Sequence, residues 1–189
     1  MKRFVIFSMV MFITVTSWAD ANVKSGSMHA LKNAATRITV TWDYSKMLIE
    51  DMTPEAFLKE KGPEWERDYP AEVAAGESAF AANFNKKNKK YAQITDDEDA
   101  AQYEMIIHVE KFHYGSTATA VIFGGFARGA SLEGTVEIVD KATKSIICTI
   151  NYDCAGKASG VKAYGSEGRR VYACEDLAKD LAKLVSKAK

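Results

Sequence analysis

Apolar and polar side chains alternate in four stretches of the chain, at residues 37–43, 103–109, 132–140 and 146–152. In the first stretch, one side is formed by Ile38, Val40 and Trp42, and two threonines and an aspartate occupy the other. A period of two residues is that of a β-strand with one buried face. The last two stretches flank a polar turn at 140–144, which predicts a hairpin.

Three further stretches are expected to form helices, and the later two show the 3.6-residue period of an amphipathic helix. A short helix is expected over 54–61, because Thr53 suits the N-cap and proline suits the first helical position. A second helix is expected to begin at Pro70, and a third at about Glu167. The third has the clearest apolar stripe, which is formed by Cys174, Leu177, Ala178, Leu181, Leu184 and Val185.

The order of these elements predicts an α+β fold. Strands with one polar face need helices on the opposite face only. We therefore expect a two-layer sandwich, in which a mostly antiparallel sheet of about four strands has the helices packed on one face. Residues 22–35 are small and polar and are expected to form a loose lead-in, whereas 91–94 fits either a short strand or the exit of the second helix.

The segment 1–21 has the layout of a secretory signal peptide. Lys2 and Arg3 precede an apolar run of about 15 residues, which is shorter than the roughly 20 that span a bilayer. Small residues after the run permit cleavage before Asp20 or before Asn22. We therefore expect this segment to be removed, and an uncleaved N-terminal anchor is the alternative.

The remainder, 22–189, is expected to form a single domain in the periplasm or outside the cell. No cysteine lies at the candidate cleavage positions, so the lipid anchor of a bacterial lipoprotein is not expected and membrane contact is expected only peripherally. The 25 basic and 25 acidic side chains of the whole chain balance. A near-neutral protein is not drawn to nucleic acid, and no nucleic-acid partner is expected.

Three cysteines, Cys148, Cys154 and Cys174, lie in the last quarter of the chain. An oxidising compartment permits one disulfide among them. Cys148 and Cys154 stand about 20 Å apart on one strand and cannot bond there. If the last helix runs back antiparallel to that strand, its start lies near the strand's end, so we expect a disulfide between Cys154 and Cys174. Three free thiols are the alternative.

Catalytic and metal-ligating patterns are not found in the sequence. His108 and His113 are five residues apart and face opposite sides of a regular strand, so they share no metal without a bulge. The acidic run 96–99 lacks the order of a calcium loop, and the lysines of 86–90 fit a helix terminus better than a nucleic-acid patch. We expect no catalytic residues, no metal and no cofactor; an enzyme whose residues converge from distant segments is the third interpretation.

The segment 115–134 contains an unusual apolar loop. Two adjacent glycines between phenylalanines fit the tight turn of a long hairpin whose tip is apolar. The functional alternative is an exposed loop that meets a protein partner, another copy of the chain or a membrane surface. The candidate partner-binding residues are Val121, Ile122, Phe123, Gly124, Gly125 and Phe126.

Three blocks together resemble an uncharacterised family of Gram-negative envelope proteins. They are the strand AAQYEMIIHVEKFHYG, the glycine-rich FGGFARGASLEGTVEIVDKATKSII and the closing amphipathic helix. Members of that family pair a glycine-rich bend with an aliphatic strand and an Asp-x-x-Thr-Gly turn, and here Lys144 stands where glycine is usual. The resemblance covers roughly residues 100–189 and implies an envelope address and no assigned activity.

The sequence favours a non-enzymatic periplasmic or envelope-associated protein that acts through protein–protein interaction. Its partner is expected to be another envelope protein or a second copy of the chain. The alternative is a small-ligand binding module with a pocket between sheet and helices. Such a pocket is expected to be lined by Trp42, Tyr103 and Tyr152.

Overall fold

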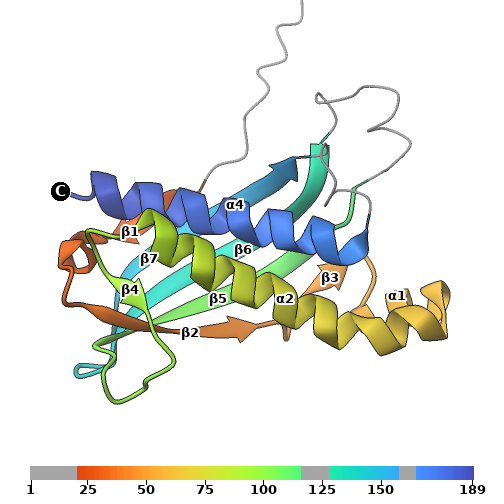
Figure 1. Cartoon of the computed structure of the whole chain (residues 1–189), viewed down its shortest axis with the longest axis horizontal. Helices are drawn as coiled ribbons and strands as arrows, with labels where there is room; N and C mark the ends of the chain where they lie inside the picture. Colours follow the sequence, from red (N-terminus) through yellow and green to blue (C-terminus); the bar gives the residue numbers. More distant parts are fainter. Residues whose placement is uncertain (1–20, 116–127, 158–164) are drawn as a thin grey trace, which may run out of the picture.

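The computed structural model describes residues 21–115, 128–157 and 165–189, and its centre is a seven-stranded sheet (Figure 1). Neighbouring strands follow the order β1-β7-β6-β5-β2-β4, and β3 pairs with the end of β5. The strands are β1 (Asn22–Gly26), β2 (Arg37–Asp43), β3 (Leu48–Ile49), β4 (Gln93–Ile94), β5 (Tyr103–His113), β6 (Arg128–Asp140) and β7 (Ser145–Lys157).

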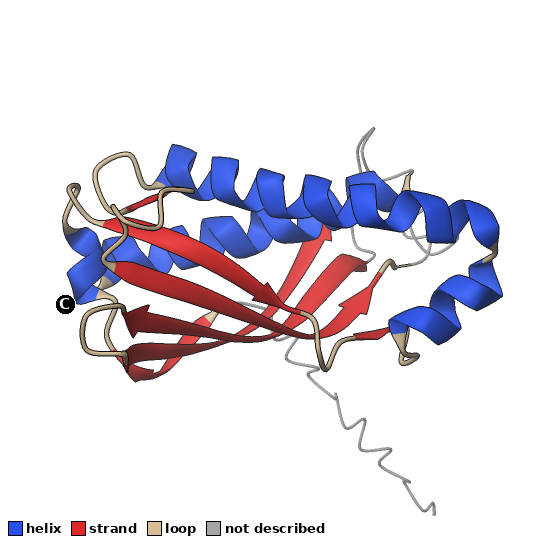
Figure 2. Ribbon diagram, turned by 90° about the horizontal axis from the view of Figure 1, so that it is seen from below, coloured by secondary structure: helices blue, strands red, loops and turns tan. Residues whose placement is uncertain are grey.

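Helices form a second layer on one face of the sheet (Figure 2). They are α1 (Pro54–Lys61), α2 (Pro63–Lys87) and α4 (Ser166–Lys187), together with the short 3-10 helix η1 (His29–Lys32). Buried side chains fill the space between the layers, among them Met105, Val136 and Ile150 from the sheet. Phe80 of α2 and Leu181 of α4 meet them from the helix side.

The α+β class is confirmed, but the sheet is larger than four strands and is mixed. The four expected strands are β2, β5, β6 and β7. Antiparallel pairing joins β5, β6, β7 and β1, whereas β2 runs parallel to both β4 and β5. The reason lies in the connection from β2 to β5, which contains α1 and α2. A helical crossover returns the chain to the same end of the sheet and makes the next strand parallel.

The expected loose lead-in is partly ordered, which corrects that prediction. Asn22 to Gly26 form β1, which pairs antiparallel with β7. All five β1 residues are exposed, so the strand is held by backbone pairing and leaves no apolar alternation in the sequence. After it, Met28 and Leu31 are buried in the core. At the opposite edge, Gln93 and Ile94 form a short strand rather than a helix exit.

The second helix begins at Pro63, not at Pro70, and α1 ends where expected. Gly62 separates the two helices with a φ of 98°, a conformation that favours glycine. Pro70 therefore lies inside α2, where it removes one backbone hydrogen bond. The first turn is held by Trp65, whose ring packs edge-on against Phe57 and Tyr114 with centroids 5.6 and 5.3 Å apart.

Candidate functional site

The face of the sheet opposite the helices is not covered by any described element (Figure 2). Strand pairing sets directly opposed residues on the same face. One row across this face consists of Asp43, His108, Thr135 and Asn151. The next row consists of Thr41, Ile106, Glu137 and Thr149. We call these eight residues and Glu104 the open face.

His108 lies between two carboxylates near the centre of the open face. Its Nδ1 is 2.8 Å from Oδ2 of Asp43, and its Nε2 is 3.6 Å from Oε2 of Glu137. Hydrogen bonds from Ser45, and then from His108, hold the pKa of Asp43 well below its usual range. A third carboxylate, Glu104, accepts a hydrogen bond of 2.6 Å from Thr41. The open face thus presents three carboxylates, two of which flank one imidazole.

The two histidines of β5 have separate partners. A bulge between Val109 and Lys111 shifts the register of the strand. Beyond it, Nδ1 of His113 lies 3.2 Å from Glu50, which also accepts the backbone N–H of Tyr114 at 2.7 Å. In the described ranges, no group of three or more histidine, cysteine or acidic side chains has an arrangement that could hold a metal ion.

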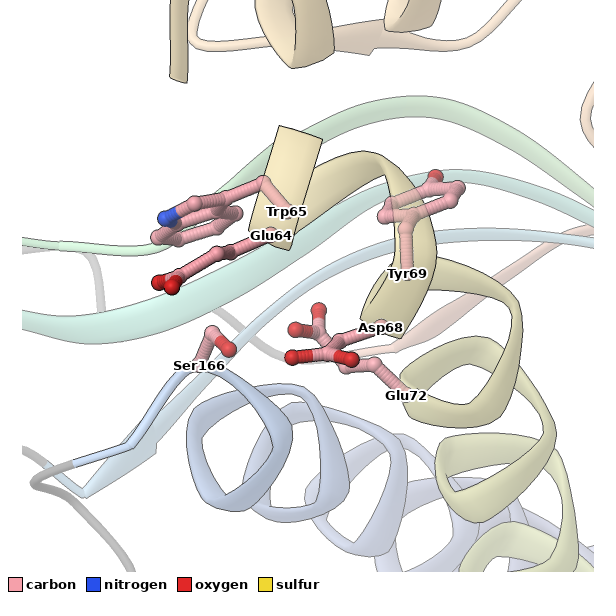
Figure 3. Close-up of a pocket in the computed structure, with 6 residues that line it drawn as sticks. All are labelled: Glu64, Trp65, Asp68, Tyr69, Glu72 and Ser166. Atoms are coloured by element: carbon pink, nitrogen blue, oxygen red, sulfur yellow. The ribbon is translucent and has the colours of Figure 1, made fainter. Parts of the chain in front are cut away.

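A small pocket lies between the first turns of α2 and the start of α4 (Figure 3). Its volume is about 110 Å³. It is lined by Glu64, Trp65, Asp68, Tyr69, Glu72 and Ser166. The carboxylates of Asp68 and Glu72 point toward the side of the pocket where Ser166 lies.

A buried ion pair lies directly behind this pocket. Arg170 of α4 is 2% exposed, and its Nε donates to Glu72 of α2 at 2.8 Å. The hydroxyl of Tyr114 donates to the same carboxylate oxygen. The guanidinium lies over the ring of Phe112, 4.1 Å from its centroid. Burial raises the pKa of Tyr114, so its hydroxyl stays protonated as a donor.

The aromatic residues expected to line a ligand pocket have other roles. The ring of Trp42 packs against Tyr44 and Phe80, with centroids 5.9 and 5.3 Å apart. Tyr152 is buried and donates its hydroxyl to the carbonyl of His108 at 3.0 Å. Tyr103 lies half-buried against the core. None of the three lines the pocket described above.

The expected Cys154–Cys174 disulfide is absent, and all three cysteines are buried free thiols. Sγ of Cys154 lies 3.7 Å from Asp180 of α4. Asp180 is six residues beyond Cys174, roughly 9 Å along the helix axis. The Sγ of Cys174 instead faces Gly76 of α2. The helix therefore starts farther from the strand than expected, and the two sulfur atoms are presented to different neighbours.

The candidate partner-binding loop, residues 121–126, lies outside the described residues. The buried pair of Glu72 and Arg170 was missed by sequence reasoning, because the two residues are 98 positions apart and neither belongs to a local motif. The one available signal in the sequence was Arg170, a charged residue one turn before Cys174 on the apolar stripe of the last helix. Within the described ranges, no helix has the length and apolarity to cross a membrane.

The chain matches no protein-family model, and no curated protein gives a significant match. Among solved structures, a PelC dodecamer from Paraburkholderia phytofirmans is 14% identical, with 85% of this chain and 96% of that chain covered and a TM-score of 0.46. A PelC variant from the same organism is 16% identical, with 87% and 96% covered and a TM-score of 0.45.

A Xanthomonas campestris protein of the DUF330 family is 8% identical, with 80% of this chain and 84% of that chain covered. Its TM-score is 0.41. Likeness at this level, here and to the PelC structures, carries no inference about activity or assembly.

Proposed function

We propose that the protein is a non-enzymatic, envelope-associated protein that acts by binding another protein. The observation that carries the proposal is the open face, a broad sheet surface that no described helix covers. Apart from Ile106 its side chains are polar, and they are half-buried or exposed. A surface of this kind suits a partner that lies flat against it.

The charge of the open face indicates the chemistry of that partner. Asp43, Glu104 and Glu137 all carry carboxylates, and His108 alone faces two of them. Complementary charge steers association and fixes the orientation of the complex. We therefore propose a protein partner that presents lysine or arginine side chains to this face.

The apolar loop remains part of the proposal on sequence grounds. Residues 121–126 connect β5 to β6, two strands that carry the open face. The sequence of that connection contains two phenylalanines, which we propose as an apolar contact to the partner. Envelope location rests on the signal-peptide pattern of 1–21, and we expect the exported protein to begin at Asp20 or Asn22 by mass spectrometry.

Charge reversal on the open face tests the proposal. A variant with Glu104→Lys and Glu137→Lys should lose co-purifying partners while its thermal unfolding stays close to that of the wild type. The matched control is Glu55→Lys with Glu60→Lys, two exposed residues of α1 and the same change in net charge. Equal recovery of partners by both variants would show that the open face is not the binding surface.

The loop is tested separately. Phe123→Asp with Phe126→Asp should leave folding intact and abolish co-purification. In-cell crosslinking from position 123, followed by mass spectrometry, should identify the partner directly. Unchanged co-purification of the double variant would remove the loop from the proposal and leave the open face alone.

A small-ligand binding module is the second candidate, and the pocket beside Glu72 favours it. Three carboxylates and two aromatic rings would suit a small cationic group. At about 110 Å³, however, the pocket is smaller than the roughly 300–1,000 Å³ of typical ligand sites. A thermal-shift screen with primary amines discriminates the two: a saturable shift that Glu64→Gln abolishes would favour the ligand module.

A further inference from the structure

The two long helices end at the same end of the molecule. α2 and α4 lie side by side and run in the same direction (Figure 1). Glu72, in the first half of α2, pairs with Arg170 in the first turns of α4. Farther along, the side chain of Asn83 donates to the carbonyl of Glu175 at 2.9 Å. Both C-termini therefore lie at the end opposite the pocket.

Three segments meet at this end through hydrogen bonds. The backbone N–H of Ala92, in the turn after α2, donates to the carbonyl of Leu31 in η1 at 2.9 Å. The Nζ of Lys32 donates to the carbonyl of Ala188, just after α4, at 2.7 Å. The turn after α2, η1 and the end of α4 thus form one continuous surface.

This surface is strongly basic. Residues 28–35, 84–92 and 183–189 contain eight lysines and no aspartate or glutamate, although the whole chain has as many acidic as basic residues. We call it the basic end. Its lysines are Lys32, Lys86, Lys87, Lys89, Lys90, Lys183, Lys187 and Lys189.

The lysines at the end of α2 are not used within the fold. Lys86, Lys87, Lys89 and Lys90 are exposed, and no ion pair joins them to another described residue. The nearby run 96–99 contains four acidic residues, of which Glu98 pairs with Lys141 at 2.7 Å. Cations in the last helical turn complement the helix dipole, but this effect falls off beyond that turn. Lys89 and Lys90 lie past the end of α2.

We propose that the basic end binds the surface of an anionic phospholipid membrane and holds the folded chain there peripherally. Lysines close to an anionic bilayer each strengthen binding by roughly fivefold. These segments contain two aromatic side chains, of which Phe84 is buried and Tyr91 is half-buried, so they lack the row of exposed rings on which successive nucleotide bases stack. This proposal goes beyond the protein partner proposed above and does not depend on it.

Vesicle co-sedimentation tests the proposal with the exported, processed protein. The probes are vesicles of phosphatidylcholine with phosphatidylglycerol, and neutral vesicles of phosphatidylcholine alone. We expect binding to the anionic vesicles to be at least about tenfold stronger than to the neutral ones, and to weaken as salt screens the lysines. Equal binding to both kinds of vesicle would overturn the proposal.

Charge reversal locates the binding surface. The variant Lys86→Glu, Lys87→Glu, Lys89→Glu, Lys90→Glu should bind anionic vesicles at least about tenfold more weakly than the wild type. The matched control changes four exposed lysines elsewhere and should bind within about twofold of the wild type. Its substitutions are Lys46→Glu, Lys59→Glu, Lys111→Glu and Lys144→Glu. If that variant unfolds, the neutral variant Lys86→Gln, Lys87→Gln, Lys89→Gln, Lys90→Gln provides the same test. Equal losses in variant and control, or preferential binding of duplex DNA over vesicles, would overturn the proposal.

Discussion

At the scale of single residues, Glu72 and Arg170 form a charged pair inside the fold. The side chains are 5% and 2% exposed, so two charges have left water and depend on each other. The hydroxyl of Tyr114 is hydrogen-bonded to both side chains, and the ring of Phe112 packs against the guanidinium. The pair joins α2, α4 and the end of β5 at one point.

Removing one partner of this pair should destabilise the fold strongly, whereas replacing both partners with apolar residues should not. We expect Glu72→Ala to lower the free energy of unfolding by about 3–5 kcal/mol, because it leaves Arg170 charged and buried. The double variant Glu72→Leu with Arg170→Met should lower the free energy of unfolding much less, because it leaves no buried charge unpaired. Urea denaturation measures both. The exposed pair of Arg67 and Asp68 is the control, and Arg67→Ala should leave the denaturation midpoint unchanged. A double variant as unstable as the single one would contradict this account.

Lys144 adopts a backbone conformation that glycine prefers. Its φ is 58°, at the last position of the turn between β6 and β7. We expect Lys144→Gly to raise the free energy of unfolding by about 0.5–1 kcal/mol, because glycine has no Cβ to strain there. The neighbouring Thr143→Gly should lower it instead. Denaturation of the two variants side by side checks the sign, and a loss of stability in both would refute the prediction.

At the scale of elements, β5, β6 and β7 approach one another closely at Gly134. A Cβ placed there would lie 2.0 Å from the carbonyl oxygen of His108 and 2.8 Å from the hydroxyl of Tyr152. The tyrosine crosses this glycine to reach the carbonyl of His108. Only glycine leaves room for that hydrogen bond, which joins β7 to β5 across β6.

Filling this space should loosen the sheet. We expect Gly134→Ala to lower the free energy of unfolding by about 1–3 kcal/mol, because the backbone of β5 must move away. Thr135→Ala, one position along and on the open face, should change it by less than about 0.5 kcal/mol. Chemical denaturation with hydrogen exchange at β5 measures the effect. Unchanged protection of the His108 region would count against it.

The strands with one buried face were readable from the sequence, and the edge strands were not. Alternation marks β2, β5, β6 and β7 because each has one side against the helices. It cannot mark β1, whose side chains are all exposed, nor β3 and β4, which have two residues each. The start of α2 was missed because Pro70 is a helix breaker locally, whereas Trp65 secures the preceding turns through distant aromatic contacts.

The candidate site was less predictable than the fold. Asp43, His108 and Glu137 each stood on the correct side of a predicted strand. Their grouping depends on which strands are neighbours and in what register, and one sequence does not contain that information. The parallel pairing of β2 with β5 is what brings Asp43 to His108 across 65 positions.

At the scale of the whole molecule, the three thiols report on solvent access to the core. Burial raises the pKa of Cys174 to about 12, and it also raises the pKa values of Cys148 and Cys154. The thiolate is the reactive form of cysteine, so the folded chain should hold all three in the protonated, unreactive form at neutral pH. Their reactivity should appear only when the whole fold opens.

Thiol labelling followed by mass spectrometry checks this expectation. Native protein near neutral pH should label slowly, whereas protein unfolded without a reducing agent should take up three labels. Two fewer labels in the unfolded protein would reveal a disulfide and contradict the free thiols. Native labelling as fast as that of the unfolded chain would contradict their burial.

Because α2 and α4 run in the same direction, acidic helix starts gather at one end of the molecule and basic helix ends at the other. Acidic side chains stand in the first turns of both helices, at Glu64, Glu66 and Glu167, and lysines gather where both helices finish. A chain without net charge can therefore still turn one end toward a charged boundary. Attached by its basic end, the molecule would stand upright, with the open face turned sideways and accessible to a partner diffusing along the same boundary.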